Sequence, residues 1–152
     1  MTVLSAQTIR RLGLVTPCEA RAMDPRTSAT YGLGPHGYDI RLDQEIRLLP
    51  GGFSLASTVE RFDLPANVAG FVHDKSTWAR RGLAVQNTVC EAAWAGWLTL
   101  ELTNHGPTEL VLPEGTPIAQ VVFHFLDEVT EQPYEGRYQR QRRGPVPAIL
   151  EK

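Results

Sequence analysis

Two carboxylates ten residues apart, Glu91 and Glu101, are the side chains of this sequence best suited to acid–base chemistry. The residues around Glu101 alternate between leucine and other side chains: Trp97, Leu98, Thr99, Leu100, Glu101 and Leu102. This alternation predicts a β-strand with its leucines facing the core and Glu101 on the opposite face. A carboxylate in that position is either solvated or faces a cleft in which it moves a proton.

Length and charge limit what the chain can do. With 152 residues and a formal net charge of −2, we expect one domain spanning residues 1–152 with a core of its own. The near-neutral charge argues against nucleic acid or an anionic membrane as a partner. Residues 137–143, however, carry four arginines and no acid, a local cationic segment that suits a small anion.

Cysteine and histidine usage points away from disulfides and zinc. Two cysteines, Cys18 and Cys90, make neither a disulfide framework nor a metal cluster, and the four histidines have no metal-ligand spacing. Without a signal peptide or a long apolar run, the expected location is the cytoplasm. Cys90 has no apparent base partner, so we interpret it as a small buried residue.

The pattern along the chain predicts an all-β fold after one short helix. Ser5 is a candidate N-cap for that helix, which ends at Gly13. The apolar period then changes to two, with strand candidates at 38–42, 53–62, 68–72, 110–112 and 118–126. Turns at 50–52, 104–107 and 113–117 separate several of them. Many short strands favour a sandwich or barrel.

Seven sequence blocks, in order, resemble the dCTP deaminase branch of the dUTPase-like superfamily. They are GYDIRL (37–42), LASTVE (55–60), LP (64–65), KSTWAR (75–80), LELTN (100–104), PxGxxIxQ (113–120) and RYQRQR (137–142). The resemblance implies a distorted jelly-roll β-barrel that forms a homotrimer with active sites between subunits. It also implies hydrolytic deamination of dCTP to dUTP and ammonia without zinc, with Mg²⁺ accompanying the triphosphate.

The resemblance assigns roles around the base and the sugar. The family's general base and acid falls on Glu101, in the Leu-Glu-Leu block. Glu91 matches an acidic residue, normally aspartate, that positions the attacking water in dUTPases and lies near the sugar in deaminases. Trp94 matches an aromatic residue that lies against the deoxyribose; a core tryptophan is the alternative. Thr88 and Val89 belong to a loop whose backbone helps hold the base and the attacking water.

A second group is implied for the triphosphate. Lys75, Ser76 and Arg80 match the phosphate motif and offer an ammonium, a hydroxyl and a guanidinium; Arg80 could instead hold the trimer interface. A C-terminal arm, residues 133–152, is expected to close on the nucleotide. Its phosphate contacts are implied for Arg137, Tyr138 and Gln141; the alternative is a solvated basic tail.

Two departures from the family bear on substrate choice. The loop 84–90 is two residues shorter than in the bacterial deaminases, and Ala92–Ala93 replace a Pro-Gly pair. Alanine lacks glycine's access to positive φ, so a turn that needs it is expected to be built differently here. A dUTP diphosphatase, a bifunctional deaminase–diphosphatase and an inactive nucleotide-binding regulator remain as alternatives. The base and phosphate level of the substrate also stay open.

Overall fold

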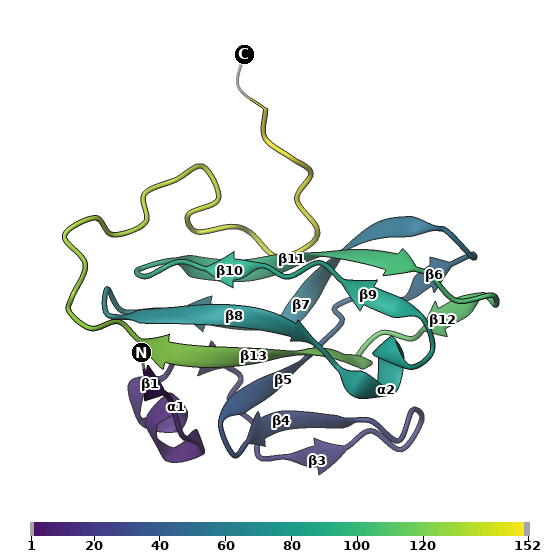
Figure 1. The fold of residues 1–152 in the computed structure, drawn as a ribbon, viewed down its shortest axis with the longest axis horizontal. Helices are drawn as coiled ribbons and strands as arrows, with labels where there is room; N and C mark the ends of the chain where they lie inside the picture. Colours follow the sequence, from purple (N-terminus) through teal and green to yellow (C-terminus); the bar gives the residue numbers. More distant parts are fainter. Residues whose placement is uncertain (1, 151–152) are drawn as a thin grey trace.

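The computed structural model describes residues 2–150; residue 1 of the expected domain and residues 151 and 152 of the expected arm lie outside this range. The described residues form thirteen strands and two short helices (Figure 1). In order they are β1 (Thr2–Val3), α1 (Ala6–Leu12), β2 (Val15–Thr16), β3 (Ala22–Met23), β4 (Thr30–Gly34), β5 (Gly37–Arg41), β6 (Ile46–Leu48), β7 (Phe53–Asp63), β8 (Val68–Asp74), α2 (Ser76–Ala79), β9 (Leu83–Val85), β10 (Val89–Cys90), β11 (Ala95–Asn104), β12 (Leu110–Leu112) and β13 (Pro117–Phe125).

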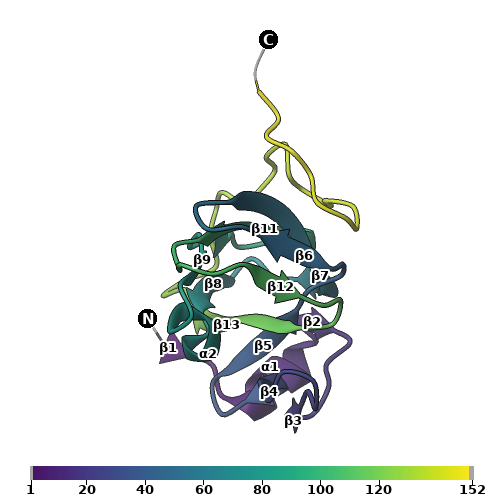
Figure 2. The same ribbon diagram turned by 90° about the vertical axis from the view of Figure 1, so that its right-hand side faces the viewer.

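The strands form two curled sheets and one small ribbon. The larger sheet has the order β10-β8-β13-β5-β4-β3, with β1 added beside β13. The second sheet has the order β2-β7-β11-β9, and β12 pairs with β6. Figure 2 shows how the sheets curl around a common interior. The Phe62 ring on β7 lies 6.2 Å from the Phe123 ring on β13, so side chains of both sheets share one core. The expected all-β, jelly-roll type of fold is confirmed.

The opening helix forms where the sequence predicts it, with one local difference. Ser5 is the N-cap residue of α1, but its hydroxyl pairs with the Thr8 hydroxyl at 3.3 Å rather than capping a backbone N–H. Gly13 ends the helix in the left-handed conformation at φ 65° and donates its N–H to the Arg10 carbonyl. A glycine adopts this conformation without a Cβ clash, which explains why the helix ends there.

The strand that carries Glu101 is buried along its inner face. Leu98, Leu100 and Leu102 are 4%, 0% and 0% exposed, while the residues between them are half-buried on the other face. β11 pairs with β7 along most of its length and with β9 at its end. Paired on both edges and anchored by its leucines, β11 gives the outward side chains a rigid base.

Candidate active site

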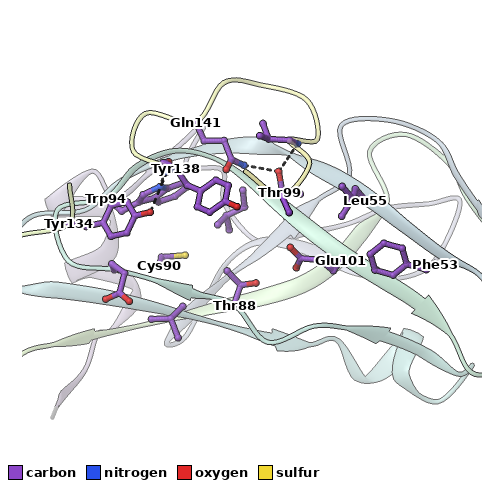
Figure 3. A pocket seen from close by; sticks show the side chains of 15 residues that line it. Phe53, Leu55, Thr88, Cys90, Trp94, Thr99, Glu101, Tyr134, Tyr138 and Gln141 are labelled. Atoms are coloured by element: carbon purple, nitrogen blue, oxygen red, sulfur yellow. Dashed lines mark hydrogen bonds between the residues drawn. The ribbon is translucent and has the colours of Figure 1, made fainter. Parts of the chain in front are cut away.

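A cavity of about 550 Å³ opens between the outer face of β11, the segment around β10 and the C-terminal arm. Its size is typical of pockets for small ligands. Figure 3 shows Trp94, Tyr134 and Tyr138 at one end, Glu101 and Phe53 at the other, and Thr99 and Gln141 between them. The lining consists of Phe53, Leu55, Thr88, Val89, Cys90, Glu91, Trp94, Leu98, Thr99, Glu101, Tyr134, Tyr138, Gln141, Val146 and Ala148.

Glu101 reaches this cavity because of its register in β11. It lies opposite Leu55 of β7, and its carbonyl accepts the Gln86 N–H at 3.0 Å. Next to it, the register of β11 and β7 shifts between Trp97 and Thr99. Such an irregularity bends a strand and redirects its side chains. The strand therefore presents Thr99 and Glu101 to the same space.

The loop before Glu91 is tied to both sheets. Its Gln86 N–H binds β11 as described, and its Thr88 carbonyl accepts the Val72 N–H of β8 at 2.9 Å. Val89, the first residue of β10, then pairs with Phe71 of β8. These backbone bonds bring Thr88 and Val89 to the cavity wall.

The turn between Glu91 and Trp94 corrects an expectation. We expected Ala92–Ala93 to avoid positive φ, but Ala93 has φ 69°. The Trp94 N–H binds the Glu91 carbonyl at 3.0 Å, which closes a four-residue turn with positive φ at its third residue. Type II turns require this and usually have glycine there. The turn thus keeps the glycine-type conformation with an alanine, at the cost of local backbone strain.

Trp94 fits both interpretations of it. Its side chain is 6% exposed, and its ring lies 6.3 Å from that of Phe62 in the core. The same side chain lines the cavity, and its indole Nε1–H donates to the Tyr138 carbonyl at 2.8 Å. Trp94 is therefore a core residue whose polar edge holds the arm.

The C-terminal arm, residues 133–150 in this structure, crosses over β11 around Gln141 and Val146, and its last segment, which is exposed, projects away from the sheets (Figures 1 and 3). The Gln141 amide Nε2 donates to the Trp97 carbonyl at 2.9 Å and to the Thr99 hydroxyl at 2.7 Å. The Val146 N–H donates to the same hydroxyl at 2.9 Å. The arm thus closes one side of the cavity by bonds to the strand that carries Glu101.

The cavity lining contains acidic side chains but no basic ones. Two carboxylates, Glu91 and Glu101, belong to its lining, and none of its fifteen lining residues is lysine, arginine or histidine. Cys90 is 1% exposed; burial, with a smaller contribution from Glu91, raises the pKa of its thiol to about 12. The thiol therefore stays protonated near neutral pH, in line with its interpretation as a buried small residue.

The residues expected at the triphosphate divide into two groups. Tyr138 and Gln141 line the cavity, but Lys75, Ser76, Arg80 and Arg137 do not. The ammonium of Lys75 lies 2.6 Å from the Asp39 carboxylate and binds the Thr30 hydroxyl at 3.1 Å. The side chain of Lys75 is therefore held by side chains of its own chain.

The other three residues of the expected phosphate set lie at the surface. Ser76 begins α2 and Arg80 follows it, and both are exposed. Arg137 is also exposed and donates to the Ile149 carbonyl farther along the arm. These residues are accessible to a molecule that approaches from outside.

Sequence reasoning missed part of the lining: Phe53, Leu55, Thr99, Tyr134, Val146 and Ala148. One signal was available for Thr99, because it is two residues from Glu101 and so lies on the same strand face. Leu55 and Phe53 depend on the pairing of β7 with β11, which a single sequence does not specify.

Residues 2–150 lack two kinds of feature. No three His, Cys, Asp or Glu side chains gather there in a group able to hold a metal ion. No helix within this part of the chain has the length and apolar character needed to cross a membrane.

Comparison with families and curated proteins gives consistent matches. The model of a family described as dCTP deaminase-like matches residues 36–126. The dCTP deaminase of Nitrosomonas eutropha is 32% identical over 188 residues, covering 98% of this chain and 100% of that protein. The dCTP deaminase of Chlamydia abortus is 33% identical over 152 residues, covering 79% of this chain and 80% of that protein.

Solved structures share the fold at low identity. The 2′-deoxycytidine 5′-triphosphate deaminase from Agrobacterium tumefaciens superposes with a TM-score of 0.63 at 18% identity, covering 82% of this chain and 48% of that chain. The native EIAV dUTPase gives a TM-score of 0.56 at 24% identity, covering 66% of this chain and 84% of that chain. These likenesses establish the architecture alone.

Proposed function

The chain belongs to the dCTP deaminase-like family, and we propose that it hydrolyses the amino group of dCTP to give dUTP and ammonia. The observation that carries this proposal is the position of Glu101: a half-buried carboxylate on a rigid strand, inside a cavity of nucleoside size. The relatives named dCTP deaminase, which match almost the whole chain, support the substrate.

In the proposed reaction, Glu101 acts first as a base and then as an acid. Its carboxylate takes a proton from water as the oxygen attacks C4 of cytosine, and returns it to the ring nitrogen N3. The second proton of the water goes to the departing amino group, so cytosine plus water becomes uracil plus ammonia. One positioned carboxylate typically contributes about 10²–10⁴ in rate, and this scheme needs no zinc.

The rest of the cavity supports this placement of the substrate. The backbone of Thr88 and Val89 is proposed to hold the base and the water, since that loop is fixed to both sheets. Trp94 is proposed to lie against the deoxyribose, and Glu91 near the sugar. Both belong to the same cavity wall as Glu101.

The triphosphate needs cations that the cavity wall of one subunit does not provide. We propose that Ser76 and Arg80 of a neighbouring copy, with Lys75 close by, complete the site in a homotrimer. Arg137, Tyr138 and Gln141 of the arm would add to it, and Mg²⁺ would arrive bound to the phosphates. An ammonium, guanidinium groups and hydroxyls suit phosphate oxygens rather than a metal ion.

Shared sites can be tested by mixing two inactive variants. Chains with Glu101→Gln lack the proton carrier, and chains with Arg80→Ala lack a phosphate contact. In mixed oligomers some sites would combine an intact Glu101 with an intact Arg80, so activity should return. No recovery after subunit exchange, shown by labelled chains, would contradict sites shared between copies.

The deamination assay compares wild type, Glu101→Gln and the control Glu109→Gln, incubated with dCTP and magnesium. Glu109 is exposed beside β12 and outside the cavity. Ammonia release should fall at least about 100-fold in Glu101→Gln alone, with thermal unfolding unchanged. Equal rates in all three would refute the assignment, and dCTP binding without product would indicate a regulator.

Glu91 favours a second candidate, a bifunctional enzyme that also hydrolyses the dUTP it forms. Its exposed carboxylate lies in the same cavity wall as Glu101, where it could position a water near the α-phosphate. The same assay would then yield dUMP and pyrophosphate. Loss of these products, but not of ammonia, in Glu91→Gln would assign the second step to Glu91.

A further inference from the structure

Gln139 belongs to the arm, but its side chain is directed at the Glu91–Trp94 turn. Its amide Nε2 donates to the Ala93 carbonyl at 2.8 Å and to the Tyr134 carbonyl at 2.8 Å. Its Oε1 accepts the Ala95 N–H at 2.9 Å. Both amide protons and the amide oxygen are therefore engaged, and Gln139 is not part of the cavity lining.

The turn that Gln139 holds is the strained one. Ala93 has φ 69°, a conformation that alanine rarely adopts because its Cβ crowds the backbone. Gln139 binds the carbonyl of this residue and the N–H two residues later. It therefore supplies hydrogen bonds where the turn would otherwise relax.

The same turn sets two residues of the cavity. Glu91 begins it and Trp94 ends it, and both side chains line the cavity. Trp94 also donates its indole N–H to the Tyr138 carbonyl, next to Gln139 in the arm. A docked arm and a left-handed Ala93 are thus joined by bonds on either side of one short turn.

We infer that Gln139 is a positioning residue, which locks the Glu91–Trp94 turn to the arm and so assembles the cavity wall only when the arm is docked. Without this lock, Ala93 relaxes and the arm spends more time undocked. A ligand then has to restore both the turn and the docked arm as it binds. Its apparent affinity therefore falls in proportion to the fraction of molecules that have the docked arm before binding. This inference rests on the proposed function only for its kinetic readout.

The first test follows the arm without any substrate. Trypsin cleaves after the arginines of the arm when the arm is undocked, and Trp94 fluorescence reports loss of the bond to the Tyr138 carbonyl. Cleavage of Gln139→Ala should be about 10-fold faster than that of wild type. The matched control is Gln7→Ala, an exposed glutamine on α1 that lies outside the cavity. Equal cleavage in the two variants would overturn the inference.

The second test uses kinetics with dCTP. In Gln139→Ala, KM should rise about 10-fold while kcat changes less than about twofold, since saturating ligand redocks the arm. A residue that merely stabilises the fold would lower the active fraction, and with it kcat, at unchanged KM. That pattern would overturn the inference. If wild type shows no turnover at all, the proposed function fails, whereas the cleavage result stands or falls independently.

A rescue distinguishes the turn from other effects of the substitution. Glycine adopts positive φ without strain, so Ala93→Gly should return cleavage and KM of Gln139→Ala to within about threefold of wild type. In the wild-type background the same change should have little effect. Absence of rescue, with both variants folded, would show that Gln139 does not act through the strain at Ala93.

Discussion

β11 and the arm that lies on it touch the same ligand space but are held in place differently. β11 pairs with β7 and β9, and its leucines fill the core. The arm has one bridge pair with the strand, Gly96 with Gln141, and few other backbone bonds, such as that of the Arg140 N–H to the Ala95 carbonyl. Its other contacts with β11 are made by side chains, among them Gln141 and Thr99. All of its described residues are exposed or half-buried.

The difference predicts two separate stabilities in one small protein. Detaching β11 from the sheet would break its pairing with both β7 and β9 and expose the core. We therefore expect β11 to detach only when the whole protein unfolds. Undocking of the arm breaks its hydrogen bonds to β11 and to the Glu91–Trp94 turn and the ion pair of Arg143 with Asp43, and leaves the pairing of the sheets intact. Glu101, the proposed proton carrier, would thus stay fixed while the cavity opens and closes beside it.

Leu100→Ala tests the fixed side and should have the largest effect. Leu100 is 0% exposed and lies on the face of β11 opposite Thr99 and Glu101. A buried Leu→Ala change lowers the free energy of unfolding by about 2–5 kcal/mol, measured by urea denaturation. The control Val111→Ala, at a side chain 41% exposed on β12, should change it far less. Similar losses in the two variants would contradict the assignment of β11 to the core.

Thr99→Val tests the docked side and should have an intermediate effect. It keeps the shape of the side chain but removes the hydroxyl that accepts from Gln141 and Val146. Loss of this acceptor should favour arm undocking by about 1–3 kcal/mol, measured as faster tryptic cleavage, with little change in global unfolding. The control Thr103→Val lies on the same strand face, outside the cavity. If Thr99→Val instead lowers global stability, the arm and barrel unfold together.

The sequence predicts the fixed region well because its physics is local. Alternating leucines place Glu101 on the outer face of β11, and this face lines the cavity as expected. Trp94 and Glu91, which the resemblance assigned to a nucleotide site, line the same cavity as Glu101. Periodicity and motif order were sufficient for these residues.

The sequence predicts the docked region poorly because its contacts join distant segments. The sequence around Gln139 contains no pattern that predicts the hydrogen bonds of its side-chain amide with Ala93 and Ala95. At Ala93, intrinsic preference argues against positive φ, and tertiary bonds override that preference. Phe53 and Leu55 similarly depend on the register between β7 and β11.

Acid should lower the stability of the sheets rather than undock the arm. We expect this effect to be smaller than those of Leu100→Ala and Thr99→Val. Burial, with repulsion from His73, lowers the pKa of His124 on β13, whereas an unfolded histidine has a pKa of about 6.5. Below that pH the unfolded chain binds a proton that the folded chain excludes. The contribution of His124 to the free energy of unfolding is therefore complete above about pH 6.5 and is lost as the pH falls below that value.

Urea denaturation at pH 7.5 and 5.0 measures this fall, and His124→Gln should reduce it. The control His36→Gln changes an exposed histidine before β5 and should leave the fall unchanged. Arm cleavage in the folded protein should vary little over the same range, apart from the pH dependence of trypsin itself, since Gln139, Gln141 and Thr99 do not titrate. The arm also has a charged contact with the barrel, the ion pair of Arg143 with Asp43. If acid released the arm before the sheets unfolded, this ion pair would be the main support of docking, and the neutral amide and hydroxyl contacts would not be.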